Sequence, residues 1–188
     1  MNLFSPTPPL AERMRPKNLE DFIGQEHLVV PGKVLYNMVN NHLLRSMIFW
    51  GPPGVGKTTL AMILARSVNK TFFTISAIDS GVKEVRSVIE QARLAGGAVL
   101  FIDEIHRFNK SQQDSLLAAV EKGIITLIGA TTENPSFEVI SALLSRCQVY
   151  VLQSLSEDSL KALVLQALEH DELLKDKNIA VQEWDALL

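Results

Sequence analysis

The sequence has a single cysteine, Cys147, among 188 residues. One thiol cannot form an internal disulfide, which excludes a disulfide-stabilised scaffold and a zinc site built on cysteines, and fits a reducing compartment. The four histidines are scattered along the chain without the short spacing of metal ligands: His27, His42, His106 and His170.

Long apolar runs and a strong charge of one sign are also absent. No apolar stretch reaches the ~18 residues that a bilayer span needs. The N-terminal residues lack the basic region followed by an apolar region that marks a signal peptide. Eighteen basic against 21 acidic residues give a net charge of −3, which is not the signature of a nucleic-acid-binding chain. We therefore expect a soluble cytoplasmic protein, not associated with membranes, in which any nucleic-acid contact comes from a local patch.

Strands and helices are predicted to alternate along most of the chain. Apolar or β-branched runs predict strands, and apolar residues at three- and four-residue spacing predict helices. Five such strands separated by helices are typical of an α/β fold with a parallel sheet covered on both faces. Ser111 and Gly123 are expected to begin and end one helix. The predicted strands are 47–50, 71–76, 98–103, 124–131 and 148–152, and the predicted helices are 32–44, 57–68, 82–95, 111–123 and 137–145.

The pattern changes after the fifth strand. A helix is predicted over 156–170, and the final segment 181–188 again has apolar residues at helical spacing. We expect residues 1–152 to form a core domain that begins with an extended arm and flanking segment over 1–31. Residues 153–188 are expected to begin a second, helical domain that continues beyond this sequence.

The segment 51–59 has the spacing of a phosphate-binding loop. Gly51, Gly56, Lys57 and Thr58 fit the G-x-x-x-x-G-K-T motif, and the segment joins a predicted strand to a predicted helix. Glycines let backbone N–H groups approach phosphate oxygens, and the helix start adds its positive dipole end. Lys57 is expected to reach the β- and γ-phosphates of ATP, and the Thr58 hydroxyl to bind Mg²⁺. The alternative is a glycine-rich turn without a ligand. The other loop residues expected to contact the nucleotide are Pro52, Pro53, Gly54, Val55 and Thr59.

Two acids end the third predicted strand. Asp103 is expected at the carboxyl end of the strand, where open α/β sheets bind ligands, and would hold Mg²⁺ through a water. Glu104 is the candidate base that orients and deprotonates the attacking water. A nucleotide-binding switch needs the first acid but not the second, so the pair favours hydrolysis. The alternative is two acids solvated at a strand end.

Small polar side chains end the fourth predicted strand. Thr131, Thr132 and Asn134 would lie at the same edge of the sheet as the acids, where one of them could contact the γ-phosphate or the attacking water. The alternative is a capped loop in which Asn134 and Pro135 supply turn chemistry.

Taken in order, these motifs resemble those of the AAA+ ATPases of the clamp-loader clade. The segments HRFNKSQQD (106–114) and ATTENPSFE (130–138) with ALLSRC (142–147) are more specific. They resemble the replication-associated recombination protein A group of bacteria, which includes the eukaryotic Werner-helicase-interacting ATPase. The resemblance extends from residue 10 to about residue 170.

The resemblance implies a five-stranded ATPase core followed by a helical lid, and a tetramerisation region further on. It implies a homo-oligomer that binds ATP and Mg²⁺, with DNA-stimulated ATP hydrolysis at stalled or damaged replication forks. Single-stranded-DNA-binding protein and forked or junction DNA are the implied partners, and the implied location is the bacterial nucleoid. The second sensor arginine of the family would lie beyond this sequence.

The resemblance also assigns residues. It makes Thr132 or Asn134 the first sensor, with Thr132 favoured, and it makes Arg146, in the segment SRC, an arginine finger that enters a neighbouring subunit's ATP site. The alternative for Arg146 is a helix cap. An active site shared in this way predicts that a lone subunit binds ATP better than it cleaves it. The adenine side of the nucleotide is assigned to Arg15, Pro16, Phe22, Ile23 and Gly24; Phe22 and Ile23 also fit as core residues.

Contact with DNA is inferred from a set of basic residues. Basic residues lie near one face of the predicted helix 82–95 and just before the next helix, where they could follow a nucleic-acid backbone. The alternative is a solvated helix face with paired charges. The residues are Lys83, Arg86, Arg93, Arg107 and Lys110.

Three other functional classes share parts of this pattern. A clamp-loader subunit that binds ATP without hydrolysing it would not need Glu104. A Holliday-junction branch-migration motor shares the IGATT-like segment but has its own winged DNA-binding domain further on. A protein-remodelling AAA+ subunit would need an aromatic residue in the loop after the second strand, and AIDSGVKE (77–84) has none.

Overall fold

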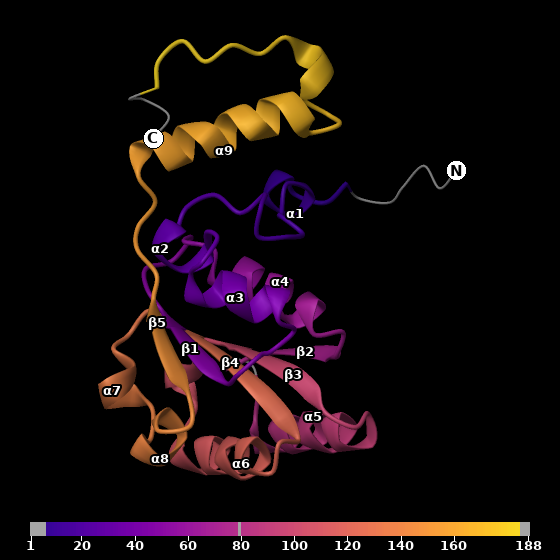
Figure 1. Cartoon of the computed structure of the whole chain (residues 1–188), viewed down its shortest axis with the longest axis vertical. Helices are drawn as coiled ribbons and strands as arrows, with labels where there is room; N and C mark the ends of the chain where they lie inside the picture. The colour runs from indigo at the N-terminus through magenta and orange to yellow at the C-terminus, as the bar shows by residue number, and fades with distance from the viewer. Residues whose placement is uncertain (1–6, 79, 185–188) are drawn as a thin grey trace.

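The computed structural model describes residues 7–78 and 80–184, which form a five-stranded parallel sheet with helices on both faces (Figure 1). The strand order is β2-β3-β4-β1-β5, and each neighbouring pair is parallel. The predicted α/β fold is therefore confirmed. The strands are β1 Met47–Trp50, β2 Thr71–Ser76, β3 Ala98–Asp103, β4 Ile125–Thr131 and β5 Gln148–Val151.

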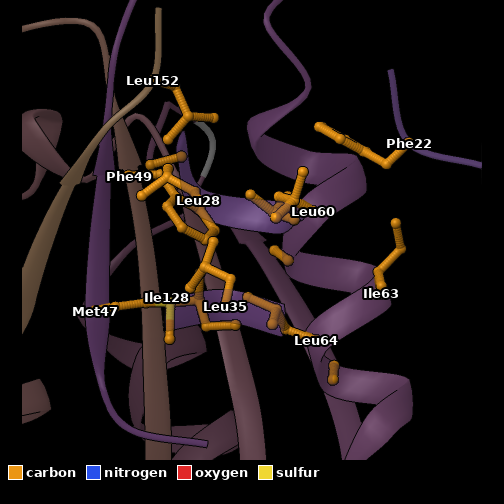
Figure 2. Close-up of a cluster of buried hydrophobic side chains, with 14 of the residues drawn as sticks. Phe22, Leu28, Leu35, Met47, Phe49, Leu60, Ile63, Leu64, Ile128 and Leu152 are labelled. Atoms are coloured by element: carbon orange, nitrogen blue, oxygen red, sulfur yellow. The ribbon is translucent and has the colours of Figure 1, made fainter. Parts of the chain in front are cut away.

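The two faces of the sheet carry separate hydrophobic clusters. On one face, Leu35 and Leu60 pack with Met47 and Phe49 of β1 (Figure 2). Ile48, which alternates with those residues along β1, belongs to the cluster on the other face. Alternation along a strand thus fills both faces with apolar side chains. Helices α3 and α4 cover the first face, and α5, α6 and α8 the second.

The helices are shorter and more numerous than the sequence pattern predicted. The longer ones are α3 Val34–Asn40, α4 Lys57–Ser67, α5 Val82–Leu94, α6 Lys110–Glu121 and α9 Glu157–His170. The short ones are α1 Leu10–Arg13, α2 Glu26–Val29, α7 Pro135–Glu138 and α8 Ser141–Leu144, with 3₁₀ turns η1 Ile105–Arg107 and η2 Lys175–Lys177.

Two predicted helices were wrong in extent. The 32–44 helix ends early because His42 takes a left-handed φ of 52° and its ring nitrogen contacts the carbonyl of Ser67 at 2.6 Å. The 137–145 helix is broken into α7 and α8. Val139 is extended and buried there, and the backbone N–H of Ile140 donates to the side chain of Gln113 at 2.8 Å. Tertiary contacts override the helical pattern in both places.

One smaller expectation also needs correction. The N-cap of α6 is Asn109, not Ser111: its side chain accepts a hydrogen bond from the backbone N–H of Gln112, whose side chain accepts in return from the N–H of Asn109. Strand β5 is an edge strand of the sheet, and Val149 and Val151 on it are exposed.

The C-terminal part leaves the sheet and lies over the N-terminal segment (Figure 1). The predicted helix 156–170 is confirmed as α9, and the Ser156 side chain caps it. The helix predicted over 181–188 was wrong for residues 181–184, which have no helical structure, and Leu187 and Leu188 lie outside the described residues. In the part of the chain that the structure describes, no helix has the length and apolar content of a membrane-spanning segment.

Candidate functional site

The phosphate-binding loop joins β1 to α4, and close approaches fix its course. A Cβ atom at Gly51 would overlap the backbone carbonyl of Leu152. Gly54 and Gly56 have φ values of +78° and +93°, which side-chain-bearing residues rarely adopt. A Cβ at Gly56 would also lie 2.7 Å from the ring of Phe22. The motif glycines therefore meet both backbone and packing requirements.

Lys57 begins α4 and turns back over this loop. Its ammonium donates to the carbonyl oxygens of Gly51 at 2.7 Å and Pro52 at 2.8 Å. Burial lowers the pKa of Lys57, while the nearby carboxylates of Glu104 and Asp103 act to raise it. A cation held by the loop and facing two acids is placed to receive phosphate oxygens.

A cavity of about 330 Å³ brings the predicted phosphate and metal residues together. Thr58, from the start of α4, and Asp103, from the end of β3, line it, and these are the residues predicted to hold Mg²⁺. Among the described residues, no group of three or more His, Cys, Asp or Glu side chains could hold a metal ion by itself. Two protein oxygens suit Mg²⁺, which usually keeps several waters and binds substrate phosphates. The other lining residues are Ala11, Arg15, Pro53, Gly54, Gly56, Lys57, Thr59 and Glu104.

Glu104 stands at the wall of this cavity in an uncommon backbone conformation. Its φ and ψ are 53° and 47°, in the left-handed region. Its backbone N–H donates to Oδ1 of Asp103 at 3.2 Å, and its carboxylate lies 3.2 Å from Nδ1 of His106. Its side chain is 27% exposed, so it can meet a water in the cavity.

The polar residues after β4 take different places. The Thr131 side chain is buried and bonded to the backbone of Glu133 and to His106. Asn134 caps α7, accepting from the N–H of Ser136 at 3.0 Å, as the alternative interpretation expected. Thr132 is half-buried and stays the sensor candidate.

A larger, mostly apolar cavity of about 560 Å³ adjoins the phosphate cavity. The two share Ala11, Arg15, Gly54, Gly56 and Thr59. Its apolar lining suits the base and sugar of a nucleotide. Of the predicted adenine-side residues, Arg15, Pro16, Phe22 and Ile23 line it, together with Val55.

Gly24 is the exception among the adenine-side residues. It does not line this cavity, and it has a φ of +85° where a Cβ would lie 2.5 Å from Leu155. The sequence reasoning missed the opposite wall, which α9 supplies through Leu163, Val164 and Ala167. The helical spacing of apolar residues in α9 predicts an apolar face on this helix, but it does not predict which other element that face packs against.

An ion pair between distant parts of the chain was also missed. The guanidinium of Arg13 in α1 donates to both carboxylate oxygens of Asp171, just after α9, at 2.7 and 2.9 Å. Asp171 is 2% exposed, and the interaction with Arg13 lowers its pKa. No spacing rule relates two residues 158 positions apart.

Arg146 lies away from this chain's own phosphate cavity. It follows α8 and precedes the first residue of β5, at the amino edge of the sheet, whereas the phosphate-binding loop is at the carboxyl edge (Figure 1). Its side chain is 46% exposed, and its guanidinium lies 2.8 Å from Glu121 and 2.7 Å from the hydroxyl of Ser145. A weaker 3.4 Å contact to the carbonyl of Ala142 is all that resembles a helix cap.

The basic residues considered for DNA contact, from Lys83 to Lys110, are all exposed. Arg93 pairs with Glu90 at 3.2 Å, which fits the alternative of a solvated, paired helix face. Arg86, Arg93 and Lys122 line a shallow groove between α5 and α6. DNA contact at these residues stays a prediction.

Comparison with known proteins gives consistent matches. The model of the family described as "ATPase family associated with various cellular activities (AAA)" matches residues 47–155. Replication-associated recombination protein A of Escherichia coli K12 is 56% identical over 165 residues, which is 86% of this chain and 37% of that protein. ATPase WRNIP1 of Dictyostelium discoideum is 50% identical over 179 residues, 93% of this chain and 20% of that protein.

Solved structures match as well. The Thermotoga maritima RuvB Holliday junction branch migration motor aligns with a TM-score of 0.66 and 31% identity, covering 84% of this chain and 54% of that one. A substituted form of the same RuvB gives a TM-score of 0.68 at the same identity and coverage. The chain thus spans little more than a third of the first of these curated relatives and about half of the solved chains.

Proposed function

The chain belongs to the ATPase family associated with various cellular activities (AAA), and we propose that it is the ATP-hydrolysing part of an oligomeric motor that acts on DNA. Its resemblance to the replication-associated recombination protein A group is confirmed by the identities of 56% and 50%. The processes named for these full-length relatives are assigned to this chain only as a proposal.

The observation that carries the proposal is the pair of adjoining cavities. The polar one gathers Lys57, Thr58, Asp103 and Glu104, and the apolar one suits a nucleoside. A nucleoside triphosphate has this division into a charged and an uncharged part. Arg15, which lines both cavities, lies where the two parts of the ligand would join.

The proposed chemistry uses this chain's side chains as follows. Thr58 and Asp103 would hold Mg²⁺, which neutralises charge on the phosphate oxygens when it is bound. Lys57 would leave the carbonyls of Gly51 and Pro52 for the phosphates. Glu104 would orient a water for in-line attack and accept its proton.

Replacement of the base tests hydrolysis directly. We expect Glu104→Gln in the full-length protein to lower ATP turnover by about 10²–10⁴-fold, the usual contribution of a general base. Binding of a fluorescent ATP analogue should be retained, because the amide keeps the shape of the side chain. Glu133→Gln, at an exposed acid near the same edge of the sheet, is the control and should keep turnover. Equal turnover in wild type and Glu104→Gln would refute hydrolysis by this mechanism.

We further propose that Arg146 acts on a neighbouring subunit's ATP, which requires a homo-oligomer. Its exposure and its place at the amino edge of the sheet support this, because it cannot serve the loop at the other edge of its own sheet. The name of the bacterial relative, replication-associated recombination protein A, supports replication forks as the site of action. DNA stimulation, contact with single-stranded-DNA-binding protein and a nucleoid location belong to the same proposal, as do a core domain over 1–152 and the start of a lid domain over 153–188.

A second candidate is branch migration at four-way junctions. The alignment with the RuvB motor at 31% identity favours it. ATPase rates of the full-length protein, measured against protein concentration with no DNA, forked DNA and four-way junctions, distinguish the two. Stimulation by forks above junctions supports the first candidate, and the reverse order supports the second.

A further inference from the structure

The imidazole of His106 joins the two strand ends that flank the phosphate cavity. His106 lies in η1, directly after the acids that end β3. Its Nδ1 is 3.2 Å from Oε2 of Glu104 and 3.0 Å from Oγ1 of Thr131, the last residue of β4. The His106 side chain is only 14% exposed, so surrounding residues restrict its orientation.

The chemistry of the partners fixes which imidazole nitrogen carries the proton. The 3.2 Å between Nδ1 and Oε2 of Glu104 is an electrostatic contact, which a proton on Nδ1 makes attractive. The Thr131 hydroxyl accepts from the N–H of Glu133 at 3.0 Å and can donate its one proton to the carbonyl of Glu133 at 3.2 Å. It is therefore left to accept from Nδ1 as well, which places the proton on Nδ1, beside the carboxylate of Glu104.

We propose that His106 is a positioning residue, whose Nδ1–H holds the carboxylate of Glu104 at the cavity wall and joins it to the end of β4. The inference rests on the proposed role of Glu104 as the base. Thr132 follows Thr131 directly. A γ-phosphate that displaces this sensor segment therefore also moves His106 and, with it, the carboxylate of Glu104. The left-handed backbone conformation of Glu104 is uncommon, and such conformations persist where the surrounding structure holds the residue in place.

Three substitutions at one position test the donor. In His106→Asn the amide nitrogen falls near the place of Nδ1, whereas in His106→Gln it falls nearer the place of Nε2. We expect His106→Ala to lower kcat of the full-length protein by about 10–100-fold, as small misplacements of catalytic groups do, with KM for ATP little changed. His106→Asn should recover much of that loss and His106→Gln should not. Unchanged kcat in His106→Ala, or equal rescue by Asn and Gln, would overturn the proposal.

A spectroscopic measurement tests the geometry without turnover. Nitrogen-15 NMR of the histidines should show a proton on Nδ1 of His106, and His106→Ala identifies its signal. Thr131→Val and Glu104→Ala should each change that signal. A bare Nδ1 with the proton on Nε2 alone would overturn the proposal, whatever the ATPase rates. Loss of turnover in Glu104→Gln with normal turnover in His106→Ala would refute this inference and leave the proposed function standing.

Discussion

Gly56 lies where the phosphate-binding loop passes under the ring of Phe22. Its φ is +93°, and a Cβ there would be 2.7 Å from one ring atom and 3.0 Å from another. The motif requires glycine for the approach of phosphate, but in this protein the N-terminal segment requires it as well. At the scale of single residues, one glycine thus serves the ligand and the core at the same time.

This double requirement predicts a stability loss. Gly56→Ala should lower the free energy of unfolding by about 1–2 kcal/mol through its left-handed backbone and by a further ~1–3 kcal/mol through crowding against Phe22. Gly32→Ala is the matched control, because Gly32 has a φ of +86° but no atom within 4 Å of a Cβ. Urea unfolding of both variants measures the difference. Equal losses would mean that Phe22 moves aside at no cost.

At the scale of elements, α8 and β5 decide what Arg146 can reach. Contact between α8 and α6 places the arginine beside Glu121, at the amino edge of the sheet. Arg146 and Arg45 line one open groove at this edge of the sheet. The groove therefore offers a surface with two arginines, away from this subunit's own phosphate-binding loop.

The trans role predicts a specific pattern of loss and rescue. Arg146→Ala should keep ATP binding and lower turnover by about 10³–10⁵-fold, the range for arginine fingers. Mixing it with Lys57→Ala, which lacks the phosphate lysine, should restore some hydrolysis where subunits of the two kinds meet. Arg45→Ala, in the same groove, is the control for lost positive charge. No rescue in mixed oligomers that have been shown to form would contradict the trans role.

At the scale of the whole molecule, the ion pair between Arg13 and Asp171 closes the chain over the apolar cavity. Residues of α1 and α9 line that cavity on two sides, and the pair joins the ends of these helices. Asp171 also accepts from the backbone N–H of Leu173 at 3.1 Å. A buried carboxylate with these partners keeps α9 against the N-terminal segment.

Loss of this pair should loosen the cavity. We expect Asp171→Asn to lower the melting temperature and weaken binding of a fluorescent ATP analogue, whereas Asp176→Asn, which removes an exposed charge nearby, should change neither. The pKa of Asp171 is lowered on folding, so its contribution is complete above the usual aspartate pKa and is lost as pH falls through the lowered value. Melting curves recorded from neutral to acid pH should therefore converge for wild type and Asp171→Asn at the acid end. A constant difference at every pH would contradict the ion-pair explanation.

Much of the fold and part of the site could be predicted. Strands β1 and β3 match their predicted ranges, because a buried parallel strand needs a continuous apolar or β-branched run. The helix break at Val139 could not be predicted, because it depends on a hydrogen bond from the next residue, Ile140, to Gln113, which lies 27 positions earlier in the chain. A local sequence pattern indicates only the conformational preference of its own segment, and a hydrogen bond to a distant side chain can override that preference.

Local sequence pattern was enough to predict the phosphate-binding loop, the acids Asp103 and Glu104, and the parallel sheet that brings them to one edge. These follow from local spacing and from the rule that parallel strands end together. The folded structure was needed to show that α9 forms a wall of the apolar cavity, that Arg13 meets Asp171, and that His106 lies between two strand ends. Such contacts join residues that are far apart in the sequence and follow no regular spacing, so only packing in three dimensions selects them.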